Sequence, residues 1–92
     1  MKNKNNKTRI DLSHHYPDIY FTMREAECVY LLIKYETRKT IGKKLGISFR
    51  TVDYYLENVK RKLDCKTKRS LCVAMEKINY KKIYEDILKV NI

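Results

Sequence analysis

The chain has 92 residues, which is enough for one small domain with a single modest core and too few for two independent ones. Lysine and arginine outnumber aspartate and glutamate by 21 to 11. Such a surplus favours a polyanionic partner, a lipid surface or a need for solubility, and nucleic acid is the first of these to consider. The longest apolar run, Cys28 to Ile33, is far shorter than the roughly 20 residues that cross a bilayer, so we expect no membrane span and no membrane partner.

The cysteines and the first residues predict a cytoplasmic protein. The three cysteines are odd in number and widely spaced, without a C-x-x-C pair, so we expect them to be reduced, and Cys28 and Cys72 to be small apolar side chains. The segment Met1 to Arg9 has no apolar stretch behind it and lacks the features of a secretory signal. We expect no metal and no cofactor.

Residues 1–20 are predicted to form a flexible basic arm and a lead-in. The segment from Met1 to about Ser13 is rich in asparagine and lysine and has too little apolar surface to become ordered by itself. Two interpretations stay open: a solubilising arm, or a basic arm that lies along a phosphate backbone or enters a minor groove. Residues 14–21 contain the single proline and several aromatic residues, and we expect them to be extended and to pack on the domain.

From Thr22 onward the apolar spacing is helical. Thr22 and Glu25 form the pattern of a capping box, which predicts a helix that begins at Thr22 and continues to about Tyr35. Thr37 is placed to cap a short second helix. Gly46 follows that helix as the residue that best tolerates a left-handed backbone.

A third helix is predicted over about residues 49–63, with Ser48 as its cap. Its apolar residues recur at three- and four-residue intervals and form one narrow stripe of Val52, Leu56, Val59 and Leu63. The segment "KKLGISFRT" therefore predicts a helix, a tight turn and a second helix at a steep angle.

The face opposite the stripe is polar and its surroundings are basic. Residues 37–63 contain eight lysines and arginines against two acidic residues. In DNA-binding helix-turn-helix proteins the second helix enters the major groove and presents side chains of its N-terminal half to base edges. The alternatives are a solvated surface and a helix-turn-helix module that binds a protein without specific DNA binding.

The stretch from Phe21 to about Ala74 resembles the LuxR/GerE-type helix-turn-helix domain of bacterial transcription regulators. "FTMRE" at 21–25 is similar to the family's "LTxRE", "TRKTIGKKLGI" at 37–47 to "SNKEIAxxLxI", and residues 48–63 to "SxxTVxxHxxNIxxKL". The resemblance implies an all-α, four-helix domain over residues 21–78 with a helical extension over 79–92. It also implies sequence-specific binding of double-stranded DNA, a homodimer on DNA formed through the fourth helix, and RNA polymerase as a further partner.

The resemblance also implies roles for individual residues. Thr51 and Lys62 correspond to phosphate contacts, and Asp53, Tyr54 and Glu57 to positions that reach bases. The full set expected to contact DNA is Thr37, Lys39, Lys43, Lys44, Ser48, Arg50, Thr51, Asp53, Tyr54, Tyr55, Glu57, Asn58, Arg61 and Lys62.

Two of these positions depart from the family. Asp53 and Glu57 are acidic, and a carboxylate can accept a hydrogen bond from cytosine but cannot donate one to guanine. Either the preferred DNA sequence is unusual, or Arg50 and Arg61 neutralise the two acids across a helical turn. Tyr55 replaces the family's histidine, and its ring either bonds a phosphate or packs.

A fourth amphipathic helix is predicted in "KRSLCVAMEKI", at 68–78, with Leu71, Met75 and Ile78 on one side. These three are the expected dimer interface, and core packing is the alternative. Residues 79–92 continue the helical spacing, and a fifth helix there could strengthen the dimer, cover the core or dock another partner. No Gly-rich phosphate loop and no pairing of a nucleophile with a base is visible, so we do not expect an enzyme.

Overall fold

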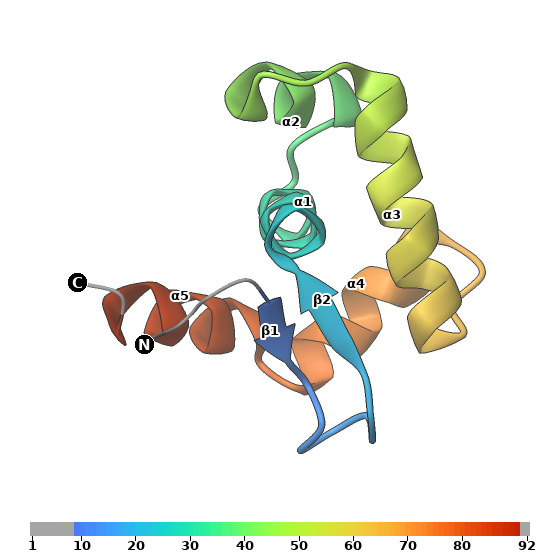
Figure 1. The fold of residues 1–92 in the computed structure, drawn as a ribbon. Coiled ribbons are helices and arrows are strands. Elements are labelled where there is room, and N and C mark those ends of the chain that lie inside the picture. The colour runs from blue at the N-terminus through green and yellow to red at the C-terminus, as the bar shows by residue number, and fades with distance from the viewer. Residues whose placement is uncertain (1–8, 91–92) are drawn as a thin grey trace.

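The helices follow one another as α1 (Met23–Ile33), α2 (Arg38–Leu45), α3 (Phe49–Leu63), α4 (Lys68–Lys77) and α5 (Tyr80–Val90) in the computed structural model, which describes residues 9–90 (Figure 1). Two short antiparallel strands, β1 (Arg9–Asp11) and β2 (Tyr20–Thr22), precede them. The predicted all-α class is therefore confirmed, with one small hairpin added. Within the described residues, no helix is both long enough and apolar enough to span a membrane.

Each predicted helix start is confirmed by a side-chain cap. Thr22 and Glu25 form the capping box of α1, in which each side chain bonds the backbone N–H of the other residue. The hydroxyl of Thr37 accepts the N–H of Thr40 at the start of α2, and that of Ser48 accepts the N–H of Thr51 at the start of α3. These bonds satisfy amide donors that the first turn of a helix leaves without a partner.

The ends of α2 and α3 both use a left-handed residue. Gly46 ends α2 with φ of 71°, as the sequence predicted. Asp64 ends α3 with φ of 56°. Aspartate tolerates this conformation better than most residues that have a Cβ atom, so α3 can end here without a glycine.

The hairpin corrects the prediction of a flexible arm. Residues 1–8 lie outside the described part of the chain, but the expected tail extended to about Ser13. Ile10 pairs with Phe21 across the two strands, and both are fully buried, as is Leu12. β1 has only one apolar residue, Ile10, and three residues are too few to show a strand period against a polar background.

The core lies between the hairpin, α1, α4 and the buried side of α3. Val52, Leu56, Val59 and Leu63 are all buried, which confirms the predicted apolar stripe of α3. Cys28 is fully buried as expected, and this burial raises the pKa of its thiol to about 11. Cys72 is partly buried, and burial raises its pKa as well.

The fifth helix covers α1 with aromatic side chains. Tyr80 is fully buried, and its hydroxyl donates to the carbonyl of Ala26 at 2.8 Å. Tyr84 stacks on Tyr30 with ring centroids 4.4 Å apart, and the hydroxyl of Tyr30 donates to Glu85 at 2.6 Å. Burial raises the pKa of Tyr80 well above its usual value, because the charged phenolate would be cut off from water. Of the three roles left open for the C-terminal extension, covering the core is the one that these contacts show.

Candidate nucleic-acid interface

The two helices of the α2–α3 unit meet through backbone atoms. The N–H of Ile47 donates to the carbonyl of Gly42 at 2.9 Å, and a Cβ atom on Gly42 would lie only 2.6 Å from the carbonyl oxygen of Ile47. No real Cβ contact is this short, so a side chain at position 42 would force the turn to move. The turn is therefore held by contact between backbone atoms of Gly42 and Ile47. Figure 1 shows that α3 crosses the end of α2 at a steep angle, as predicted.

The side of α3 opposite the core is open to solvent. Tyr54 has 63% of its surface exposed, and Arg50, Glu57 and Arg61 are exposed beside it. Together with the burial of the apolar stripe, this confirms the predicted sidedness of the helix. We call Arg50, Tyr54, Glu57 and Arg61 the outer face of α3.

One flank of α3 carries an ion pair to α2. The guanidinium of Arg38 donates from Nη1 to Oδ2 of Asp53 and lies over the ring of Phe49, 4.7 Å from its centroid. The side chains of Arg38 and Asp53 keep 47% and 38% of their surface exposed. Asp53 is therefore neutralised from the preceding helix.

The second acidic residue of α3 is paired within its own helix. Nζ of Lys60 lies 2.7 Å from Oε2 of Glu57. One of the two alternatives named Arg50 and Arg61 as the partners of the acids, and the structure shows neither pair: Arg61 donates to Asn58 at 3.0 Å, and no carboxylate of residues 9–90 lies within ion-pair distance of Arg50. Both acids are paired with a cation, Asp53 with Arg38 and Glu57 with Lys60.

The other flank of α3 is tied to α1 and the hairpin through Lys62. Its ammonium donates to Oε1 of Glu25 at 2.7 Å and to the carbonyl of Tyr20 at 2.9 Å. Glu25 is only 4% exposed and already belongs to the capping box of α1. Since an ammonium has three N–H groups, at most one is left for the phosphate that the resemblance assigns to Lys62.

The remaining hydroxyl and amide positions lie between the outer face and the core. Ser48 and Thr51 share a hydrogen bond at 2.9 Å at the start of α3, and Asn58 accepts from Arg61. Tyr55 is partly buried and packs against the core, and its ring meets that of Tyr54 edge-on at 5.6 Å. Packing is thus established for Tyr55, whereas its contact with a phosphate stays a prediction.

The lysines of α2 border the turn. Lys39 and Lys43 line a shallow hollow of about 500 Å³. The other lining residues are Gly42, Gly46, Ile47, Ser48 and Phe49. Lys44 instead points to Glu36, 2.8 Å away, and this hydrogen bond lowers the pKa of the Glu36 carboxyl. Lys39 and Lys43 therefore carry the charge of this hollow, since neither meets a carboxylate in the part of the chain that the structure describes.

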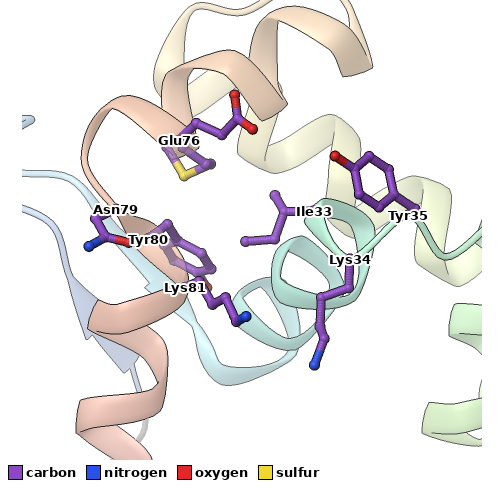
Figure 2. Close-up of a pocket in the computed structure, with 8 residues that line it drawn as sticks. Ile33, Lys34, Tyr35, Glu76, Asn79, Tyr80 and Lys81 are labelled. Carbon is purple, nitrogen blue, oxygen red and sulfur yellow. The ribbon is translucent and has the colours of Figure 1, made fainter.

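A second hollow of about 450 Å³ lies away from the α2–α3 unit, between the end of α1 and the turn from α4 to α5 (Figure 2). Its rim includes Tyr35, which is 91% exposed, together with Glu76 and Lys81. None of its lining residues belongs to α2 or α3. This hollow is therefore separate from the outer face.

The expected dimer residues of α4 need a correction. Leu71 and Met75 are fully buried in the core, and Ile78 is partly buried against it. Leu71 and Met75 therefore have no surface to offer to a second copy, whereas the role of Ile78 stays a prediction. The periodicity identified an apolar stripe correctly, but this stripe faces the core. Core packing was the alternative to a dimer interface in the sequence analysis.

Arg38 and Lys60 are functional candidates that the sequence analysis did not include. Lys60 follows Glu57 by three residues, so helical spacing could have identified the pair. Arg38 lies 15 residues before Asp53, and only the crossing of α2 over α3 brings the two together. No local pattern could have revealed that contact.

The arrangement as a whole is that of a helix-turn-helix domain: a short helix, a turn closed by backbone contact, and a second helix with one side buried and one side displayed. A family model described as "GerE: Bacterial regulatory proteins, luxR family" matches residues 20–75, which is more than half of the chain. The chain belongs to this family of DNA-binding transcription regulators. No curated protein and no solved structure matches the chain.

Proposed function

We propose that the chain binds double-stranded DNA in a sequence-specific manner, with α3 in the major groove. The observation that carries this proposal is the sidedness of α3, in which four buried apolar residues fix one side and the outer face is left open to solvent. The major groove of B-DNA accepts a helix presented in this way. The family membership and the basic surplus of the chain support the same conclusion.

Phosphate contacts are proposed around the turn. Lys39 and Lys43 supply ammonium groups beside the start of α3, where Ser48 and Thr51 place their hydroxyls. Backbone N–H groups at a helix N-terminus also favour an anion. Phosphate contacts of this kind fix the register of the protein on DNA but do not depend on sequence.

Base contacts are proposed for Arg50 and Tyr54, near the N-terminal end of the outer face. Arg50 meets no carboxylate of the described residues, so its guanidinium is available to bind the O6 and N7 atoms of guanine. Tyr54 offers an exposed ring and a hydroxyl that can donate or accept. Asp53 and Glu57 are each paired with a cation, which reduces their repulsion of phosphates.

A homodimer on DNA is also proposed, but through the outer side of α4. Val73 is 45% exposed and borders a hollow with Tyr16 and Ala74, so a modest apolar surface remains there after Leu71 and Met75 are buried. A two-fold dimer would place two copies of α3 on half-sites about one helical turn apart. RNA polymerase, which the resemblance also implies as a partner, stays a prediction.

The test is selection of bound fragments from a randomised duplex pool, followed by competition binding at two salt concentrations. We expect an enriched motif, and affinity that falls steeply with salt because bound lysines and arginines release counterions. If no enriched duplex competes better than random DNA, the proposal of sequence-specific binding fails. The helix-turn-helix module that binds a protein would then be the better hypothesis.

A further inference from the structure

The ion pair between Arg38 and Asp53 places an acidic residue on a surface that is proposed to bind DNA, where basic residues are normally favourable. Asp53 follows directly after the Thr51–Val52 pair of α3, on the helix proposed to enter the major groove. A carboxylate there adds negative charge to a surface that approaches phosphates. In this chain a cation from the preceding helix meets it.

Two contacts define the position of the Arg38 guanidinium. Its Nη1 donates to Asp53, and its Cζ atom lies 4.7 Å from the centroid of the Phe49 ring. Arg38 is the first residue of α2, directly after the cap formed by Thr37. The guanidinium is thus placed by an acid and an aromatic ring of α3. Both partners are on the helix proposed to enter the major groove.

The location of Asp53 decides what the pair can do. Asp53 lies at the flank of α3 nearest α2, between the buried stripe and the outer face, and its side chain is 38% exposed. A free carboxylate at this edge could accept a hydrogen bond from the amino group of cytosine, and it would repel nearby phosphates. A carboxylate bound to Arg38 has one oxygen occupied and its charge offset.

We propose that Arg38 is a specificity-determining residue that acts through Asp53: by binding this carboxylate it prevents Asp53 from selecting cytosine and leaves base preference to Arg50 and Tyr54. This inference rests on the proposed DNA-binding function. Arg38 is a positioning residue here, because its effect passes through a second side chain and does not need contact with DNA.

The test compares three variants on the duplex that the wild-type protein prefers and on a randomised pool. Arg38→Ala exposes Asp53 to the phosphates, and we expect it to lower affinity about five- to tenfold. The same variant should enrich duplexes with cytosine at a position that the wild-type protein does not select. Asp53→Asn alone is the reference for the double variant, because it removes the carboxylate while Arg38 stays in place.

The decisive variant is Arg38→Ala combined with Asp53→Asn. If Arg38 acts through Asp53, the second substitution removes the exposed acid and should return affinity to within about twofold of wild type, since the net charge is then unchanged. The enrichment for cytosine should disappear as well. If the double variant binds as weakly as Arg38→Ala, then Arg38 itself contacts DNA and the inference is overturned.

A matched control comes from Lys82, which pairs with Asp86 on α5 at 3.2 Å. Lys82→Ala also removes one positive charge and exposes one acid, but on a helix that packs against α1 and α4. We expect this control to change affinity less than twofold and to leave base preference unaltered. Circular dichroism melting of each variant shows whether it is folded, and Arg38→Gln replaces Arg38→Ala if the latter is not.

Failure of this inference and failure of the proposed function give different results. A wild-type protein that selects no motif contradicts the proposed function. A wild-type protein that selects a motif, with the same motif in Arg38→Ala, contradicts only the role of Arg38.

Discussion

The α1–α5 side and the α2–α3 side of the molecule are stabilised in different ways. Tyr80, Tyr84 and Tyr30 join α5 to α1 through ring packing and hydrogen bonds to Ala26 and Glu85. The α2–α3 unit instead has a backbone contact at the turn, side-chain caps, and ion pairs near the surface. Aromatic burial supplies stability on the first side, whereas the second keeps its charged groups available to a partner.

This difference separates two kinds of tyrosine in one chain. Tyr80 is fully buried and Tyr54 is 63% exposed, although both lie on amphipathic helices. Substitution of the first should therefore change folding, and substitution of the second should change binding. The following predictions test that separation, beginning with the largest expected effect.

Tyr80→Ala should lower the free energy of unfolding by about 3–5 kcal/mol, because it opens a cavity in the core and leaves the Ala26 carbonyl without its donor. Urea denaturation followed by circular dichroism measures this change. The fraction that remains folded should bind DNA with wild-type preference. A loss below about 1 kcal/mol would mean that α5 contributes little to the core.

Gly42→Ala should damage both stability and binding. The added Cβ atom meets the Ile47 carbonyl oxygen, and we expect a cost of about 1–3 kcal/mol even though alanine favours a helix. The shifted turn should also weaken DNA binding in the folded protein. Gly46→Ala is the control: it has open space around the new Cβ but a φ of +71°, so it should reduce stability by about 1 kcal/mol and leave the turn in place.

Lys62→Met should reduce the free energy of unfolding by about 1–2 kcal/mol, because Glu25 is buried and would lose a charged partner. The slope of log affinity against log salt should stay the same. Lys43→Met is the matched control, and we expect the opposite pattern from it: unchanged stability, and a slope that is smaller by about 0.9. A smaller slope for Lys62→Met would instead assign its third N–H group to a phosphate.

Tyr54→Ala should have the smallest effect on folding, within about 0.5 kcal/mol, because the side chain is largely exposed. Its effect should appear in selection from a randomised pool, as a changed base at one position of the motif. Thr51→Ala provides the comparison, since loss of a proposed phosphate contact should weaken all duplexes about equally. The same shift in motif from both variants would contradict the separation of base contacts from phosphate contacts.

The sequence predicted the helices well because their signals are local. A capping residue, an apolar stripe and a helix-ending glycine each lie within a few residues of the boundary that they mark, and Thr22, Thr37, Ser48 and Gly46 are all where they were expected. The hairpin was missed because no local pattern marks Ile10 and Leu12 as core residues. Their place in the fold depends on the pairing of β1 with β2.

The candidate site was predicted less completely, for a related reason. Which side of α3 is displayed follows from periodicity, but which cation meets which acid depends on how two helices cross. Arg38 lies far from Asp53 in the chain, and Lys62 lies 37 residues from Glu25. The α4 stripe was found correctly, yet periodicity alone could not show whether Leu71 and Met75 face the core or a second copy.

The contact between Gly42 and Ile47 has a consequence for how the DNA preference of this chain can change. Because the angle between α2 and α3 is set by main-chain atoms, it does not depend on the identity of the side chains on the outer face. Substitutions at Arg50, Tyr54 or Arg61 can therefore alter the preferred operator while the orientation of α3 relative to α2 stays the same. The preferred operator of this chain can thus change while the turn between α2 and α3 stays as it is.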